Sequence, residues 1–61
     1  MPEVIVELAQ GRTVEQKRAL VKGITQVVVE TCNTPASEVT VIIHETPLTD
    51  KAKGGVLFAD R

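Results

Sequence analysis

The sequence contains very little of what usually holds a small protein together. It has one cysteine, so no disulfide can form within the chain, and its one histidine leaves the ligand set of a structural zinc site incomplete. A chain of 61 residues buries only about 60% of its unfolded surface, which makes an isolated monomer marginal. We therefore expect one domain over residues 1–61 that gains stability by forming an oligomer.

Aromatic residues and charge of one sign are also scarce. Phe58 is the one aromatic residue, and seven Lys and Arg residues nearly balance eight Asp and Glu residues. A chain without a basic excess or stacking platforms is a poor candidate for binding nucleic acid. No apolar run approaches the roughly 20 residues that span a bilayer, and no signal peptide is recognisable. The free Cys32 is typical of a reducing compartment, so we expect a cytoplasmic protein.

What the sequence does contain is a regular alternation of apolar and polar residues near its start. Between Glu3 and Ala9, the side chains of Val4, Val6 and Leu8 would share one face of an extended chain. This period of two, with its β-branched residues, predicts a strand over 3–9.

A helix is predicted from the turn at Gln10-Gly11-Arg12 to about Cys32. Thr13 at the N-cap and Gln16 three residues later form the pattern of a capping box. Asn33 suits a left-handed position after the helix, and a proline follows it. The apolar residues have helical spacing, at Leu20, Ile24, Val27, Val28 and Cys32.

Residues 39–45 predict a second strand that is apolar on both faces in its middle, as in a strand covered on both sides. Strand, helix and strand form a β-α-β unit with parallel strands and a right-handed crossover. One helix covers one face of the sheet, so we expect the other face to meet another subunit. After a loop over 46–55, Val56-Leu57-Phe58 is predicted to be an arm that pairs with a neighbouring chain's sheet edge.

Proline directly after the initiator methionine gives the chain a candidate base. Met1 is readily removed before small residues, and the Pro2 nitrogen would then be a secondary amine. An α-amino group titrates at about 7.7–8.0, and burial or a nearby cation lowers that pKa. Such an amine can act as a general base near pH 7. The alternative is that Pro2 simply begins the strand.

Arg12 is a candidate carboxylate ligand, because it immediately precedes the N-cap of the predicted helix. Free amides and the helix dipole favour anions there, and Arg adds a bidentate donor. Pro2 lies at the other end of the first strand, seven residues and about 23 Å from Ala9. The two residues can share a site only if they come from different subunits. The alternative for Arg12 is an ordinary solvated side chain.

Four other residues are weaker candidates for a functional role. Lys51 and Lys53 can surround the entrance of a site for an anionic substrate, or belong to a solvated loop. Histidine side chains can act as acids or bases, but a lone histidine at a strand end, here His44, is more often structural. Cys32 is expected to be a small buried apolar side chain.

Several of these segments together resemble the 4-oxalocrotonate tautomerase family. They are Met1-Pro2, the turn Gly11-Arg12-Thr13-Val14-Glu15-Gln16-Lys17, and His44-Glu45-Thr46-Pro47 with the later Gly54-Gly55. The likeness covers nearly the whole chain. It implies an α+β fold, namely a β-α-β subunit with a C-terminal hairpin, assembled from dimers into a hexamer with active sites between subunits.

The resemblance also implies a cofactor-free isomerase of small 2-hydroxydienoic or 2-oxo acids. Pro2 would move the proton, and Arg12 would bind a carboxylate of the substrate. Two positions depart from the family pattern, since Thr40 replaces an Arg of the second strand and Lys51 replaces an aromatic residue. Thr40 or Lys51 is expected to orient the other end of the substrate, and the usual substrate preference is expected to change.

Two other functions stay open at this point. The same site could act on water, as a hydratase, dehalogenase or decarboxylase of unsaturated acids. Alternatively, the chain could be a non-catalytic subunit of a hetero-oligomer that has lost the second-strand Arg.

Overall fold

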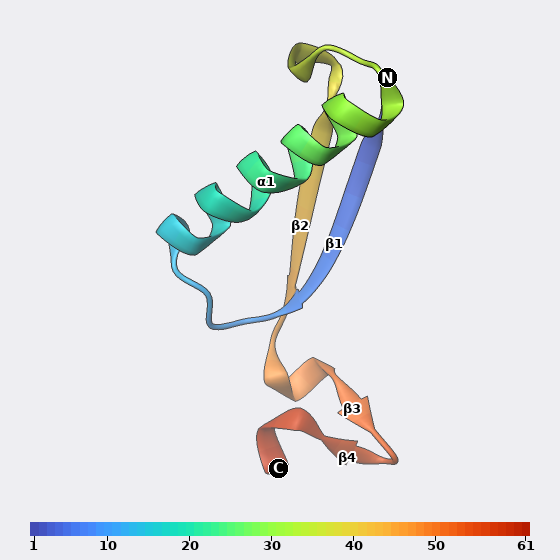
Figure 1. Cartoon of the computed structure of the whole chain (residues 1–61). Helices are drawn as coiled ribbons and strands as arrows, with labels where there is room; N and C mark the ends of the chain where they lie inside the picture. Colours follow the sequence, from blue (N-terminus) through green and yellow to red (C-terminus); the bar gives the residue numbers. More distant parts are fainter.

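A computed structural model describes all 61 residues and places one long helix beside a small parallel sheet (Figure 1). The order of the main elements is β1 (Glu3–Ala9), α1 (Val14–Cys32), β2 (Thr40–Thr46), β3 (Ala52–Lys53) and β4 (Val56–Leu57). Short 3-10 helices occupy Ala36–Glu38, Leu48–Asp50 and Phe58–Asp60. The α+β fold predicted from the sequence is confirmed.

Strands β1 and β2 run parallel and are in register along their whole length. Val4 pairs with Val41 and Val6 pairs with Ile43, so these four side chains share one face of the sheet. Each of the four is partly shielded from solvent. Helix α1 crosses the sheet on one side only (Figure 1). The residues that alternate with this set, among them Ile5, therefore form an uncovered face.

The ends of α1 have the chemistry that the sequence predicts. The Thr13 hydroxyl accepts a hydrogen bond from the Gln16 amide, and the Gln16 side chain accepts one from the Thr13 amide, which completes the capping box. Asn33 follows the helix in the left-handed conformation, with φ of 52°. Gly11 has φ of 127°, a conformation that L side chains rarely adopt, so the turn before the helix depends on glycine.

The second strand lies one residue later than predicted, at 40–46 rather than 39–45. Val39 does not belong to the strand because its amide donates to the Ala36 carbonyl and closes a 3-10 turn. At the other end, Thr46 pairs with Ala9, and its carbonyl accepts a hydrogen bond from the Gln10 amide. The pairing with the end of β1 therefore extends β2 by one residue, to Thr46.

The C-terminal segment forms a hairpin, as the family resemblance implies, rather than the loop and neighbour-pairing arm expected from its residues alone. Strand β4 pairs with β3 of its own chain, in an antiparallel hairpin turned by Gly54 and Gly55. Both glycines have positive φ, 62° and 82°, as a two-residue hairpin turn requires. Because the turn lets the chain fold back on itself, the hairpin that the family resemblance implies forms without a neighbour.

The single chain leaves most of its surface in solvent. No residue is fully buried, and Ile5 on the uncovered face is 53% exposed. The radius of gyration is 14.5 Å, whereas a compact chain of this length would have about 10.5 Å. The hairpin extends away from the β-α-β unit and gives the molecule its length of 42 Å (Figure 1). No helix combines the length and hydrophobicity that crossing a membrane requires.

The capping box yields a test of how much the helix depends on Thr13. We expect Thr13→Ala to lower the free energy of unfolding by about 1 kcal/mol, because the Gln16 amide at the helix start loses its acceptor, the Thr13 hydroxyl. Denaturant unfolding at one fixed protein concentration measures the change. Thr13→Ser, which keeps the hydroxyl, should stay close to the parent, and equal losses in both variants would contradict this assignment.

Candidate active site

The amino-terminal end of the sheet carries two of the predicted site residues, Pro2 and Thr40. The Thr40 amide donates a 3.0 Å hydrogen bond to the Pro2 carbonyl, which fixes the backbone of Pro2 beside the start of β2. The Thr40 hydroxyl is exposed and has no hydrogen-bond partner in the chain. A neutral donor is therefore available next to Pro2.

Met1 lies outside the fold. Its side chain is 94% exposed, and neither its backbone nor its ammonium group forms a hydrogen bond or ion pair. Pro2 itself is partly shielded. Removing Met1 would therefore cost no contact and would place a ring nitrogen at the end of β1.

Arg12 lies at the opposite end of β1, beside a shallow hollow of about 220 Å³. The hollow is lined by Leu8, Arg12, Gln16, Lys17 and Leu20. Lys17 forms an ion pair with Glu45, and the Gln16 side chain is held in the capping box. Arg12 is thus the one cation of this hollow without a carboxylate partner, and the two leucines provide an apolar wall.

Two backbone donors at the start of α1 are free as well. The amides of Val14 and Glu15 have no acceptor, while those of Thr13 and Gln16 are satisfied by the capping box. The carboxylate of Glu15 is engaged by Arg18, so it does not occupy these donors. Free amides at a helix start favour an anion. The turn therefore offers free donors of the kind that bind a carboxylate, and the carboxylate site at Arg12 stays a prediction.

Lys51 lies on the hairpin, apart from Pro2 and Arg12. Its ammonium group is over the ring of Phe58, 5.5 Å from the centroid. One chain therefore brings Pro2 together with Thr40, and separates this pair from Arg12 by the length of β1. The sequence predicted this separation.

The sequence interpretation missed two side-chain contacts between distant segments, a hydrogen bond and an ion pair. Glu7 and His44 are directly opposite in the parallel register, and the imidazole Nδ1 lies 3.3 Å from the carboxylate. Lys17 of α1 pairs with Glu45 of β2 at 2.5 Å. Once strands 3–9 and 40–46 are aligned, the first pair is readable from the sequence, whereas the second requires the position of the helix. No group of His, Cys, Asp and Glu side chains converges as a metal site.

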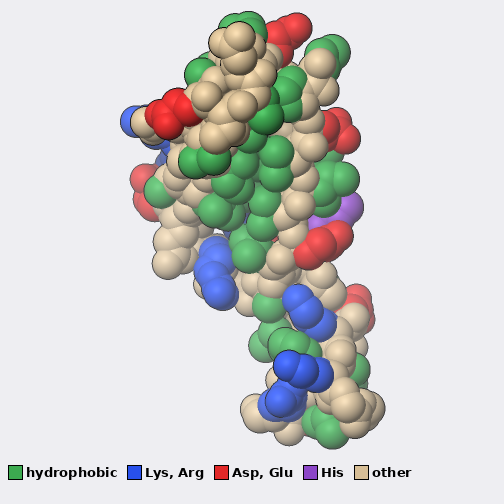
Figure 2. Space-filling model, turned by 45° about the vertical axis from the view of Figure 1, so that its right-hand side comes forward, with side chains coloured by type: hydrophobic (Ala, Val, Ile, Leu, Met, Phe, Trp, Pro, Cys, Tyr) green, Lys and Arg blue, Asp and Glu red, His purple; other side chains and the backbone are tan.

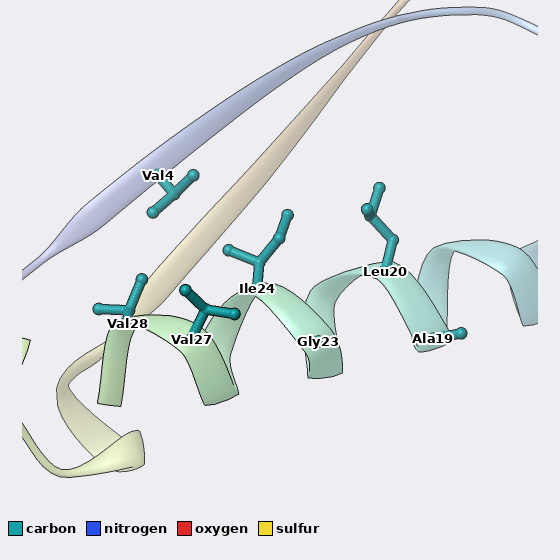
Figure 3. Close-up of a pocket in the computed structure, with 7 residues that line it drawn as sticks. All are labelled: Val4, Ala19, Leu20, Gly23, Ile24, Val27 and Val28. Atoms are coloured by element: carbon teal, nitrogen blue, oxygen red, sulfur yellow. The ribbon is translucent and has the colours of Figure 1, made fainter. Parts of the chain in front are cut away.

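An apolar groove of about 590 Å³ runs between α1 and β1 (Figure 3). Val4 points into it from the strand, while Leu20 and Ile24 point into it from the helix. Gly23 leaves the helix open there, with no atom within 4 Å of the position a Cβ would occupy. The groove contains almost no polar groups, so it does not have the character of a site for acids.

Cys32 does not have the buried position that we predicted. It is exposed at the last residue of α1. The helix ends there without crossing any other element that would cover the thiol.

Solved structures that superpose closely on this chain include tautomerases. A 4-oxalocrotonate tautomerase homologue superposes with a TM-score of 0.95 at 39% identity, covering 100% of this chain and 97% of the other. A heterohexamer 4-oxalocrotonate tautomerase from Chloroflexus aurantiacus has a TM-score of 0.91 at 30% identity, over 98% and 97% of the two chains.

Sequence comparison points to the same group. The model of the tautomerase enzyme family matches residues 2–61. A probable tautomerase of Bradyrhizobium diazoefficiens is 44% identical over 61 residues, which is all of this chain and 91% of that protein. The chain belongs to the tautomerase family, and the resemblance noted in its sequence is confirmed. This membership supports an enzyme of the isomerase type.

The unpaired state of Arg12 leads to a testable expectation about carboxylate binding. Arg12→Gln should lower kcat/KM for a carboxylate substrate by about 10- to 150-fold, because a charged hydrogen bond contributes about 1.5–3 kcal/mol. Lys22→Gln is the matched control, since Lys22 is also an exposed cation without an ion pair. Steady-state kinetics measure kcat/KM for both variants. Similar losses in the two would argue against a carboxylate site at Arg12.

Proposed function

We propose that the protein is a cofactor-free tautomerase of small 2-hydroxydienoic or 2-oxo acids. The observation that carries the proposal is the position of Pro2, which is held by Thr40 and blocked only by an exposed Met1. Family membership supports the reaction type. The whole of residues 1–61 serves as the tautomerase unit.

The reaction moves one proton and consumes nothing. After Met1 is removed, the neutral Pro2 nitrogen takes the hydroxyl proton of the enol substrate. The electrons of that bond form the ketone, and the carbon chain accepts the proton back from the Pro2 ammonium. Pro2 is therefore first a base and then an acid, which requires an amine that titrates near the working pH.

Arg12 of a neighbouring copy binds the substrate carboxylate in this proposal. Its partner-free guanidinium and the free amides of Val14 and Glu15 provide several donors for one anion. The Thr40 hydroxyl, next to Pro2, or the ammonium group of Lys51 orients the oxygen-bearing end. Because Arg12 and Pro2 lie at opposite ends of β1, both reach one substrate only across an interface.

Association with further copies is supported by the surface of the chain. Its accessible area of 4596 Å² exceeds the roughly 3,900 Å² expected of a compact 6.6 kDa monomer. The two-stranded sheet also leaves the outer edges of β1 and β2 unpaired, and such edges accept further strands. We propose a homo-oligomer built from dimers, with a hexamer as the expected size. The cytoplasmic location stays a prediction from the sequence.

A second candidate is a non-catalytic subunit of a hetero-oligomer. It is favoured by Thr40, which offers a neutral hydroxyl where the family pattern has an Arg, and by the likeness to the heterohexamer from Chloroflexus aurantiacus. A chain with this role would need a second, similar chain for activity. Turnover by the purified protein alone therefore separates the two candidates.

Substitution of Pro2 tests the proposed base. We expect Pro2→Ala to lower the rate of 2-hydroxymuconate ketonisation by at least about 100-fold, in the range that general acid–base groups contribute. Lys22→Gln, which alters an exposed side chain of α1 that forms no ion pair, should keep the parent rate. Intact mass must show loss of Met1 in the active protein. Undiminished turnover by Pro2→Ala, or by protein that retains Met1, would exclude Pro2 as the base.

A further inference from the structure

The one aromatic ring of the chain carries two cations. The Lys51 ammonium lies 5.5 Å and the Arg61 guanidinium carbon 5.3 Å from the centroid of Phe58. Cations over an aromatic face are attracted by its quadrupole, which offsets part of their mutual repulsion. Figure 2 shows several Lys and Arg side chains gathered around the narrow part of the molecule. Two cations of the C-terminal segment therefore contact the same aromatic ring.

Neither cation has an acidic partner within the chain. Asp50 and Asp60 precede Lys51 and Arg61 directly in the sequence, yet neither forms an ion pair with them. Lys17 and Arg18, by contrast, are each neutralised by a glutamate. The two positive charges on Phe58 are therefore available to an anion from outside the chain.

The backbone holds this arrangement in place. The Phe58 amide donates a 2.7 Å hydrogen bond to the Lys51 carbonyl, directly beyond the paired residues of β3 and β4. Arg61 is tied to the same residue, because its amide donates to the Phe58 carbonyl at 3.3 Å. Lys51 and Phe58 are both partly shielded from solvent. Because the group is fixed at both ends, less side-chain freedom is lost when a ligand binds.

We propose that Lys51 and Arg61, held on the ring of Phe58, form a carboxylate-binding site that selects the second polar end of the substrate. The inference rests on the proposed function and extends it to Arg61 and Phe58. The carboxylate would lie between the two cations, and the ring would contact the apolar carbon chain behind it. Arg61 binds the anion directly, whereas Phe58 is a positioning residue that acts through Lys51.

This site compensates for the neutral residue at the start of β2. Thr40 can donate one hydrogen bond, but it supplies no charge to an acid. The cations on the hairpin supply that charge from a different element, so the substrate class is an unsaturated acid with a carboxylate at the end away from Arg12. A carboxylate of a neighbouring copy has the same chemistry, and the test must separate the two sources.

Binding can be observed without catalysis, because the ring of Phe58 is the only aromatic ring besides the imidazole of His44. In the proton NMR spectrum, titration with crotonate at constant ionic strength should shift the Phe58 resonances saturably, whereas neutral crotonamide should not. The shift should be lost in Lys51→Gln/Arg61→Gln. Lys22→Gln is the matched control, since Lys22 is an exposed cation of α1 that has no ion pair and does not lie over the ring, and it should keep the shift.

Kinetics test the positioning role of Phe58. Phe58→Leu should raise KM for 2-hydroxymuconate by about two- to fivefold while kcat changes little, because a cation–π contact is lost. Phe58→Tyr should restore KM, since it keeps an aromatic face. A fall in kcat without a rise in KM would overturn the role.

The outcomes separate this inference from the proposed function. A saturable shift without turnover would remove the proposed function and leave the carboxylate site intact. No shift in the parent, or an equal shift in the double variant, would overturn the site. A change in native mass of the double variant, without crotonate binding in the parent, would assign the cations to a neighbour's carboxylate and also overturn it.

Discussion

The structure depends on one constraint: a single chain has too few elements to bury all of its apolar side chains. One helix of 19 residues packs on one face of two strands, and the side chains of Ile5 and Ile42 lie on the other. No residue becomes fully buried in the single chain, so burial of apolar surface, the main stabilising term in folding, is incomplete. The unpaired strand edges and the groove beside α1 face solvent for the same reason. Association in our proposal completes the core as well as the site.

The same constraint explains how the candidate site is divided. A parallel β-α-β unit places Pro2 at one end of β1 and Arg12 at the other, because the helix must begin where the strand ends. In our proposal, a single chain therefore presents the base at one end of β1 and the carboxylate site at the other. The hairpin carries a third group of polar side chains further away. An interface between copies is the simplest arrangement that brings these parts to one small acid.

The bounds of the helix and the order of the elements could be predicted from the sequence, because they depend on contacts between residues close in the chain. The capping residues Thr13 and Gln16 and the left-handed Asn33 fixed the helix within its observed bounds, because their contacts lie within a few residues. The bounds predicted for the second strand were one residue too early. The reason is that the amide of Val39 is used in a 3-10 turn, which the alternation of apolar and polar residues does not reveal. The exposure of Cys32 and the cations over Phe58 depend on where whole elements lie. Pattern alone could not place them.

Mixing of two impaired variants tests the central claim, that each site draws Pro2 and Arg12 from different copies. Pro2→Ala and Arg12→Gln proteins would be unfolded together in equal amounts, refolded, and assayed for ketonisation against each variant refolded alone. Random mixing should return activity to about a quarter of the parent value, since a quarter of the shared sites receive both intact residues. If the mixture is no more active than the separate variants while native mass shows mixed oligomers, Pro2 and Arg12 do not meet across an interface.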